Sequence, residues 1–390
     1  MLGPILALVA LVVVAILTVT LLIGRFPLTV GGGDGNGGGG VPIDATPAPS
    51  NVVVVPKDPR ADVPGSIVYV KQGSIWIQSG TTVRQLTSGD DDASPAWTSD
   101  GKWVYFVRTV QERGLRSIGR SRPAYYTMTY PVLMRVDPSG GDPEQVLSGK
   151  VKSGKLTSFY WLREPMPNPV DPNQLAVVTS QPASSTNDVV LQLLDATTHK
   201  FTIPKGTKEV GNLGHQDPAW HPNGTVLLYV MNDRDGRRGA PSIWRYDPAR
   251  DRVAKVTGPG YLAPSYSPDG KYIAATKTTT TGTDVVVLDA TSGGEVLQVT
   301  TDGQSWSPAW SPRGDAIAYL HVRGQIVDLR MATLSGTAPS FSVADTIDLT
   351  VVSGLDGASR PSWYIPVDEL PASPAPSSPG ASTGPPSPSP

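Results

Sequence analysis

The chain contains no cysteine among its 390 residues. This absence excludes disulfide bonds, thiolate metal sites, cysteine nucleophiles and a lipid anchor attached through cysteine. Histidine is also scarce, and the four residues of this type show no spacing typical of a metal site. They are His199, His215, His221 and His321. Neither sign of charge dominates, because 32 basic residues face 34 acidic ones, so we expect no nucleic-acid partner.

The local signatures of common enzymes are missing as well. The sequence has no G-x-S-x-G nucleophile elbow, no Walker phosphate loop and no Rossmann fingerprint. Two acidic stretches, 90–92 and 232–236, do not complete the spacing of an EF-hand calcium loop, and we interpret their charges as solvated loop residues. We therefore expect no catalytic residues, no metal and no cofactor.

Residues 5–23 form an apolar run without charge. As a helix this run would be roughly 28 Å long, close to the hydrocarbon thickness of a membrane. It exceeds the usual apolar region of a signal peptide, and no A-x-A cleavage site follows it. We predict a transmembrane anchor over 1–24, with a cleaved signal peptide as the alternative. Arg25 alone would favour a cytoplasmic C-terminal side, but long domains can cross regardless of such a bias.

Two further segments are predicted to lie outside any packed core. Residues 25–64 are rich in glycine and proline and include the run GGGDGNGGGG, which predicts a flexible linker. Residues 371–390 contain only Pro, Ser, Ala, Gly and Thr, cannot bury an apolar face and are predicted to be disordered. This tail is either a wall-spanning or O-glycosylated stalk or a solvated tail without a partner.

The remaining body, 65–370, alternates apolar and polar positions and has no amphipathic run of helical length, which predicts an all-β fold. Four segments repeat one pattern: 94–107, 217–230, 263–276 and 307–320. A proline is expected to open a strand, and the aromatic residue two positions later to fill the seam between neighbouring sheets. A tight turn and a second strand follow, then a further hairpin, so each unit makes a four-stranded propeller blade.

Degenerate copies complete the ring. The aromatic positions are then Trp97, Trp161, Trp220, Tyr266, Trp310 and Trp363, and their spacing predicts six blades. The last copy stops near Pro366, while the body begins with what resembles a second strand. We therefore expect 360–366 to be the inner strand of the blade that also contains 66–71, 74–78 and 82–87, a clasp that removes open sheet edges. A seven-bladed ring, with extra strands within 344–356, is the alternative.

The repeated pattern P-x-W-S-P-D-G-x-x-I-A-Y resembles the WD40-like repeat, also called PD40, of TolB-type β-propellers. The resemblance covers the body, is specific for the fold and is unspecific for activity. It implies a location in the cell envelope, outside the cytoplasmic membrane, and protein partners. The chain departs from TolB, which has an α/β domain ahead of its propeller, because 31–64 cannot hold such a domain. This departure puts a literal Tol–Pal role in doubt.

Two predicted loops between second and third strands are long and basic. The loop 109–129 and a second loop near 234–238 should project on the same face of the ring, close to the acidic run 90–92. Arginine and tyrosine are favoured at interfaces, so these loops are a candidate partner-binding face. Its residues are Arg113, Arg116, Arg120, Arg122, Tyr125, Tyr126, Arg234, Arg237 and Arg238. The alternative is a mobile solvated loop paired with the acidic run.

We therefore interpret the chain as a membrane-anchored, non-enzymatic, monomeric propeller of the envelope. Its expected partner is an envelope protein with an acidic segment, or an anionic polymer. A second interpretation is a carbohydrate- or small-ligand-binding sensor, which requires exposed tryptophans in the central funnel and makes the burial of Trp103 and Trp244 informative. A third is a propeller hydrolase or lyase with catalytic groups in the funnel.

Overall fold

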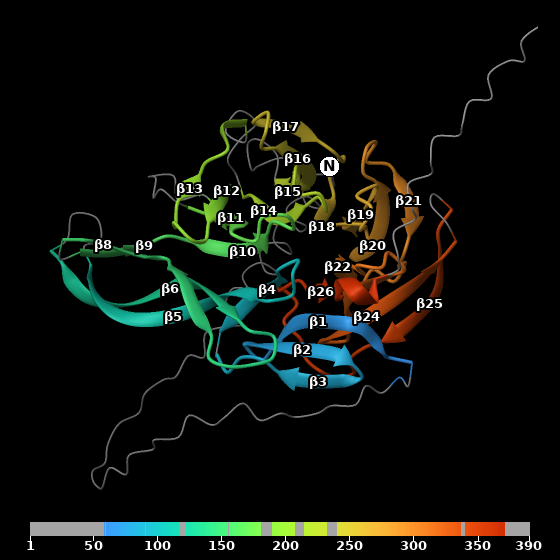
Figure 1. Cartoon of the computed structure of the whole chain (residues 1–390), viewed down its shortest axis with the longest axis horizontal. Coiled ribbons are helices and arrows are strands. Elements are labelled where there is room, and N and C mark those ends of the chain that lie inside the picture. Colours follow the sequence, from blue (N-terminus) through green and yellow to red (C-terminus); the bar gives the residue numbers. More distant parts are fainter. Residues whose placement is uncertain are drawn as a thin grey trace, which may run out of the picture. The chain divides into compact units, whose positions relative to one another are not determined.

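The computed structural model describes residues 58, 60–89, 91–116, 122–154, 156–180, 189–206, 214–231, 240–336 and 340–370. These residues form six four-stranded antiparallel sheets, one two-stranded sheet and a single turn of 3-10 helix. The sheets surround a common axis as six blades (Figure 1). The all-β prediction and the six blades are confirmed. The predicted anchor, nearly all of the predicted linker and the predicted tail lie outside the described residues, in which no helix is long and apolar enough to span a membrane.

We number the blades in the order of their inner strands. Blade 1 contains β4 (Asp92–Trp97), β5 (Val104–Arg116), β6 (Ala124–Val136) and β7 (Glu144–Ser148). Blade 2 contains β10 (Leu162–Pro167), β11 (Gln174–Thr179), β12 (Val190–Asp195) and β13 (Phe201–Thr202). Blade 3 contains β14 (Gln216–Trp220), β15 (Leu227–Met231), β16 (Ser242–Asp247) and β17 (Arg252–Lys255). A hairpin of β8 (Lys150–Ser153) and β9 (Leu156–Phe159) lies between blades 1 and 2 in the chain.

The second half of the ring follows the same plan. Blade 4 contains β18 (Tyr261–Tyr266), β19 (Tyr272–Thr278), β20 (Thr283–Asp289) and β21 (Glu295–Gln298). Blade 5 contains β22 (Ser305–Trp310), β23 (Ala316–Arg323), β24 (Ile326–Ser335) and β25 (Ser342–Asp348). Blade 6 contains β26 (Ser362–Tyr364), β1 (Val63–Lys71), β2 (Ser74–Gly80) and β3 (Thr82–Gln85), and the 3-10 turn η1 (Val367–Glu369) follows β26.

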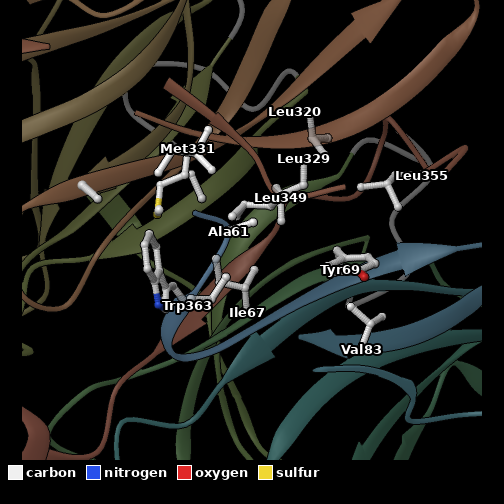
Figure 2. Packing of buried hydrophobic residues seen from close by; sticks show 14 of the residues in the cluster. Ala61, Ile67, Tyr69, Val83, Leu320, Leu329, Met331, Leu349, Leu355 and Trp363 are labelled. Carbon is white, nitrogen blue, oxygen red and sulfur yellow. The ribbon is translucent and has the colours of Figure 1, made fainter. Parts of the chain in front are cut away.

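Blade 6 joins the two ends of the described chain, as predicted. β26 pairs antiparallel with β1, with Trp363 opposite Ile67. Trp363 is buried in one cluster with Tyr69 and with apolar residues of blade 5 (Figure 2). Its indole N–H donates to the carbonyl oxygen of Pro64 at 2.8 Å. The seven-bladed alternative is wrong, because the strand found within 344–356 is part of β25, the outer strand of blade 5.

Six apolar clusters fill the six seams between blades. Inner-strand aromatic residues pack against the preceding blade, as the sequence predicts. Trp97, for example, stacks on Tyr364 of blade 6 with ring centroids 5.1 Å apart, and Trp220 packs with Leu193 of blade 2. Because these rings lie between sheets, they are mostly buried and hold the blades together.

The prediction that Trp161 occupies the aromatic position of blade 2 is wrong. Trp161 precedes β10 and is 52% exposed. The inner strand of blade 2 instead places Glu164 and Pro165 at the repeated x-Pro dipeptide and Pro167 at the aromatic position. Buried Tyr160 contributes the aromatic ring in this seam. The spacing of aromatic residues points to Trp161, whereas the x-Pro step of this blade lies at Glu164 and Pro165.

The repeated proline also lies within the inner strand and does not open it. In β4, β10, β14, β18 and β22 the register with the second strand shifts at the x-Pro dipeptide. The residue before each of these prolines has a positive φ, which is uncommon for non-glycine residues. Each of these five inner strands therefore carries a β-bulge, which re-aims the residue before proline.

A second repeated element was not recognised in the sequence. A threonine after each of four outer strands accepts the backbone N–H of the third strand of its own blade, at 2.8 to 3.0 Å. These residues are Thr87, Thr257, Thr300 and Thr350. Each follows Leu or Val, so the signal is the dipeptide Leu/Val-Thr. Because the bonded N–H groups belong to buried residues, these threonines satisfy donors that would otherwise be costly.

Candidate functional site

The segment predicted as the loop 109–129 is largely a paired hairpin. β5 and β6 remain in register from Val104 opposite Val136 to Arg116 opposite Ala124. The inner strand β4 accompanies β5 only as far as Arg108, and the outer strand β7 accompanies β6 only from Val132. We call the described residues 109–116 and 122–131 the arm. It extends beyond the blade, together with β8 and β9 (Figure 1).

Contacts with the β8–β9 hairpin brace the arm. The Arg116 guanidinium lies 5.0 Å from the ring centroid of Phe159. Glu112 forms an ion pair with Lys150 and accepts a hydrogen bond from the Tyr130 hydroxyl at 2.9 Å. These contacts hold the arm against the neighbouring hairpin along its length, so the arm presents its exposed residues from a supported structure.

The arm carries a surface of aromatic and basic side chains. Tyr125 is 65% exposed, and the Arg113 guanidinium lies 5.6 Å from its ring centroid. Tyr126 and Arg122 are also exposed. Trp161, which was predicted to take the aromatic position of blade 2, contacts Phe159 edge to face with ring centroids 6.1 Å apart and therefore lies beside the β8–β9 hairpin. The predicted Arg120, Arg234, Arg237 and Arg238 lie outside the described residues.

The prediction that the acidic run 90–92 consists of solvated loop charges is wrong for Asp92. The Asp92 side chain is buried. Its carboxylate accepts two hydrogen bonds from Arg108, at 2.6 and 2.8 Å, and one from the Thr87 hydroxyl at 2.6 Å. Because Arg108 neutralises this charge inside the blade, Asp92 does not pair with the arm arginines. Asp90 lies outside the described residues.

The axis of the ring contains a cavity of about 450 Å³, which we call the funnel. All six inner-strand segments line it, together with Val367 and Leu370. The funnel is also lined by Ser99, Pro222, Pro268 and Pro312, which lie in turns from inner to second strands. Because strands alternate in direction, these turns and the tip of the arm lie at opposite ends of the ring. The arm and the funnel are therefore separate surfaces.

One repeat position supplies the charged groups of the funnel. The residues immediately before the repeated proline form a ring around the axis, which we call the pre-proline ring. Its members, in blade order, are Ser94, Glu164, Asp217, Ala263, Ser307 and Arg360. The sequence alone does not reveal its role, although four of its members stand at the start of the aligned repeats. In the sequence, this position is the variable residue that directly precedes the repeated proline.

Hydrogen bonds link several members of the pre-proline ring from blade to blade. Glu164 Oε2 accepts the backbone N–H of Asp217 at 2.6 Å, and Asp217 Oδ2 accepts that of Ala263 at 2.9 Å. Arg360 of blade 6 reaches across the axis, where it donates to the carbonyl oxygens of Pro218 at 2.9 Å and Pro264 at 3.1 Å. Its Nε lies 3.7 Å from Asp217 Oδ1. One arginine therefore connects three blades.

The two carboxyl groups share one positive neighbour in a desolvated place. Burial, and next the nearby charge of Asp217, raise the pKa of Glu164 to about 7, although Arg163 and Arg360 act in the opposite direction. Glu164 is therefore partly protonated near neutral pH. Such a carboxyl group is typical of functional clefts, and it also occurs in structural networks.

The tryptophans named for the sensor interpretation do not line the funnel. Trp103 and Trp244 are partly buried against the cores of blades 1 and 3. Arg135 covers the ring of Trp103 at 4.1 Å, and Lys255 lies 6.0 Å from that of Trp244. The required exposed tryptophans are therefore not supplied by these two residues.

Six radial blades, the bulged x-Pro inner strands of blades 1 to 5 and the closing β26 define the class of fold as a six-bladed β-propeller. No family model and no curated protein matches the sequence. Among solved structures, the chain is similar to TolB from Acinetobacter baumannii, with 21% identity and a TM-score of 0.54 over 77% of this chain and 67% of that one. It is also similar to a putative TolB from Agrobacterium tumefaciens, with 17% identity and a TM-score of 0.50 over 75% and 91%. A chain of a nidogen–laminin complex is similar with 11% identity and a TM-score of 0.52, over 76% of this chain and 98% of that one. At these identities the likeness shows the fold.

Proposed function

We propose that the propeller is a non-enzymatic protein-interaction module that binds an acidic protein segment on its arm. The observation that carries this proposal is the braced hairpin with exposed Tyr125 and Arg113 at its side. Tyrosine, tryptophan and arginine are the residues that dominate binding energy at protein interfaces. Because the arm is paired along its length, little ordering entropy opposes binding there.

The charge of the arm selects the partner. Arg113, Arg116 and Arg122 contribute positive charge, while Glu112 is already neutralised by Lys150. A segment rich in Asp and Glu therefore complements this surface, and electrostatic attraction would raise its association rate. In the described chain, the edge of β6 that faces away from β5 has no strand partner before Val132. An extended acidic segment can add to this edge by backbone hydrogen bonds.

The likeness to other propellers supports binding as a role at the level of the fold only. A propeller of similar architecture occurs in the nidogen–laminin complex, so this scaffold is compatible with protein recognition. Function must come from the surface of this chain, which is why the arm carries the proposal.

Charge reversal on the arm tests the proposal. We expect Arg113→Glu, Arg116→Glu and Arg122→Glu together to weaken binding of a fluorescent peptide of alternating Glu and Thr by about tenfold or more, because three favourable charges become repulsive. Fluorescence anisotropy with the full chain in low salt measures this. The matched control reverses Arg250, Arg252 and Lys255 of blade 3, where the charge change is the same but the surface lacks the arm.

Two results would contradict the proposal. The first is equal binding of the peptide by the arm variant and the control, which would show that the attraction is due to general charge and not to the arm. The second is binding of polyphosphate, but not of the peptide, through the arm residues, which would replace the acidic protein segment by an anionic polymer.

We further propose that 1–24 anchors the module and that the propeller lies outside the cytoplasmic membrane. The uncharged run 5–23 and the resemblance to envelope propellers support this placement. We expect the full chain to remain in the membrane fraction after a high-salt wash and a chain lacking 1–24 to be released. A C-terminal epitope should be lost when protease is added to intact spheroplasts. Release of the full chain, or survival of the epitope, would refute the anchor or the orientation respectively.

A further inference from the structure

We propose that the funnel binds a ligand with a protonated amine on an apolar body, the ammonium group at Glu164 and Asp217 and the body against the aromatic wall. This site is distinct from the arm and does not depend on the arm binding a partner. Its occupant is defined by chemistry and is either a small organic amine or a lysine side chain of a peptide.

The funnel has the size and construction of a ligand site. A volume of about 450 Å³ lies in the range of small-molecule pockets. Six strands from different parts of the chain build its wall, and the closing pair of β26 and β1 fixes their positions. The site is thus formed by the rigid part of the protein.

The polar end of the funnel has an excess of negative groups. Arg360 is the cation of the pre-proline ring, and two of its donors already engage the carbonyl oxygens of Pro218 and Pro264. Its Nε lies 3.7 Å from Asp217 Oδ1 and compensates the negative charge of Asp217. Glu164 uses Oε2 to accept the Asp217 N–H, and no described residue donates to its Oε1. An ammonium group at Oε1 would supply both the missing donor and the missing charge.

The rest of the wall suits an apolar body. The aromatic residues Trp97, Trp220, Tyr266 and Trp310 line the funnel beyond the pre-proline ring, with the prolines of the adjacent turns. Trp97 and Trp310 are 9% and 6% exposed. Aromatic walls and carboxylates together are the usual surroundings of a bound organic ammonium.

An organic cation fits this arrangement better than a metal ion. The two carboxyl groups are accompanied by Arg360, which repels a divalent cation more strongly than a monovalent ammonium group, and among the described residues no third carboxylate lines the funnel. An ammonium group needs fewer oxygen ligands and gains from the neighbouring rings.

Binding should depend on pH through Glu164. The charged or titratable neighbours that act on it are Asp217 from β14, Arg163 from its own strand and Arg360 from blade 6. Burial and Asp217 raise the pKa of Glu164, so a bound ammonium would favour the ionised carboxylate and release its proton. Affinity for an amine should therefore increase as the pH rises through about 7.

Calorimetric titration of the full chain tests the proposal with matched probes. Tryptamine represents a small aromatic amine, indole-3-ethanol is its neutral counterpart, and an N-acetylated Trp-Lys dipeptide amide represents a lysine side chain. We expect tryptamine or the dipeptide to bind at least tenfold more tightly than indole-3-ethanol at pH 8, and the difference to shrink at pH 5.5. The amine that binds identifies the source of the ammonium group.

The decisive variant is Glu164→Gln, which keeps an acceptor for the Asp217 N–H but removes the charge. It should abolish the preference for amine over alcohol and its pH dependence. The control Glu369→Gln makes the same change on η1, beside the funnel residues Val367 and Leu370 but not in the wall, and should retain the preference. Thermal unfolding confirms that both variants fold. Any of three results would overturn the proposal. The unaltered chain binds amine and alcohol equally, it does not bind the amine, or Glu164→Gln keeps the preference for the amine unchanged. Arm variants should bind the amine normally, so this result is separable from the arm experiment.

Discussion

A chain that ends at Ser359 should fail to fold into a stable propeller, whereas a chain that ends at Leu370 should keep the full stability. The first truncation removes β26, so β1 becomes an open edge and the cluster around Trp363 is exposed. The second truncation keeps every described contact of blade 6, including Leu370, which packs against that cluster. Circular dichroism and urea unfolding distinguish the two chains.

A single substitution measures the same clasp in a chain that still folds. Trp363→Ala should lower the unfolding free energy by about 3–5 kcal/mol, because it leaves a cavity in the core and removes the donor to Pro64. Trp161→Ala is the matched control, since that side chain is half exposed, and we expect a change within about 0.5 kcal/mol. Two results would show that the clasp does not hold the ring closed. One is an equal loss of unfolding free energy in the two variants. The other is a cooperative transition of the chain that ends at Ser359 at the same urea concentration as the full chain.

Arg360→Ala should be the most damaging change in the pre-proline ring. It removes the donors to Pro218 and Pro264 and leaves Asp217 and Glu164 without their shared cation. Breaking a buried charge arrangement by removing one partner costs about 3–5 kcal/mol. Arg360→Lys keeps the charge but lacks the planar fork, so its loss should be intermediate.

The loss in Arg360→Ala should be larger at pH 8 than at pH 5.5. The folded-state pKa of Glu164 lies above its ordinary value of 4.5, so the folded chain binds this proton more tightly than the unfolded chain. The stabilisation that the folded chain gains from this proton is therefore complete below about pH 4.5 and is lost as the pH rises through about 7. Without Arg360, ionised Glu164 and Asp217 repel each other with less compensation, which enlarges the loss at high pH.

Urea unfolding at both pH values, repeated in a Glu164→Gln background, isolates this effect. The extra loss at pH 8 should disappear when Glu164 cannot ionise. A loss that is the same at both pH values in the original background would mean that Arg360 acts only through its hydrogen bonds to the carbonyl oxygens.

The fold was predictable because its signals are local and repeated. The x-Pro-x-aromatic step and its turn occur within a few residues, so four clear copies predict the blade, and the unmatched ends predict the clasp. Blade 2 shows the limit of this reasoning. Its proline-rich inner strand has Pro167 where an aromatic residue was expected, so Trp161 was chosen wrongly and Glu164 was missed.

The candidate sites depend on features that single residues do not reveal. Whether 109–129 is a loop or a hairpin depends on pairing across the turn, which its mixed polar and aromatic sequence does not specify. Glu164, Asp217 and Arg360 lie far apart in the chain and become neighbours only when the ring closes. Asp92 similarly looked like a surface acid until the fold placed Arg108 beside it.

The antiparallel clasp also determines how the ring responds to mechanical load. In that pair Ser66 lies opposite Tyr364, so the chain enters β1 and leaves β26 at the same end of the pair. Tension applied between the two ends would separate the strands from this end, one hydrogen bond after another, like a zipper. Shearing would instead load all the bonds at once. A propeller held at both ends would consequently open first at blade 6, while its other five blades remain intact.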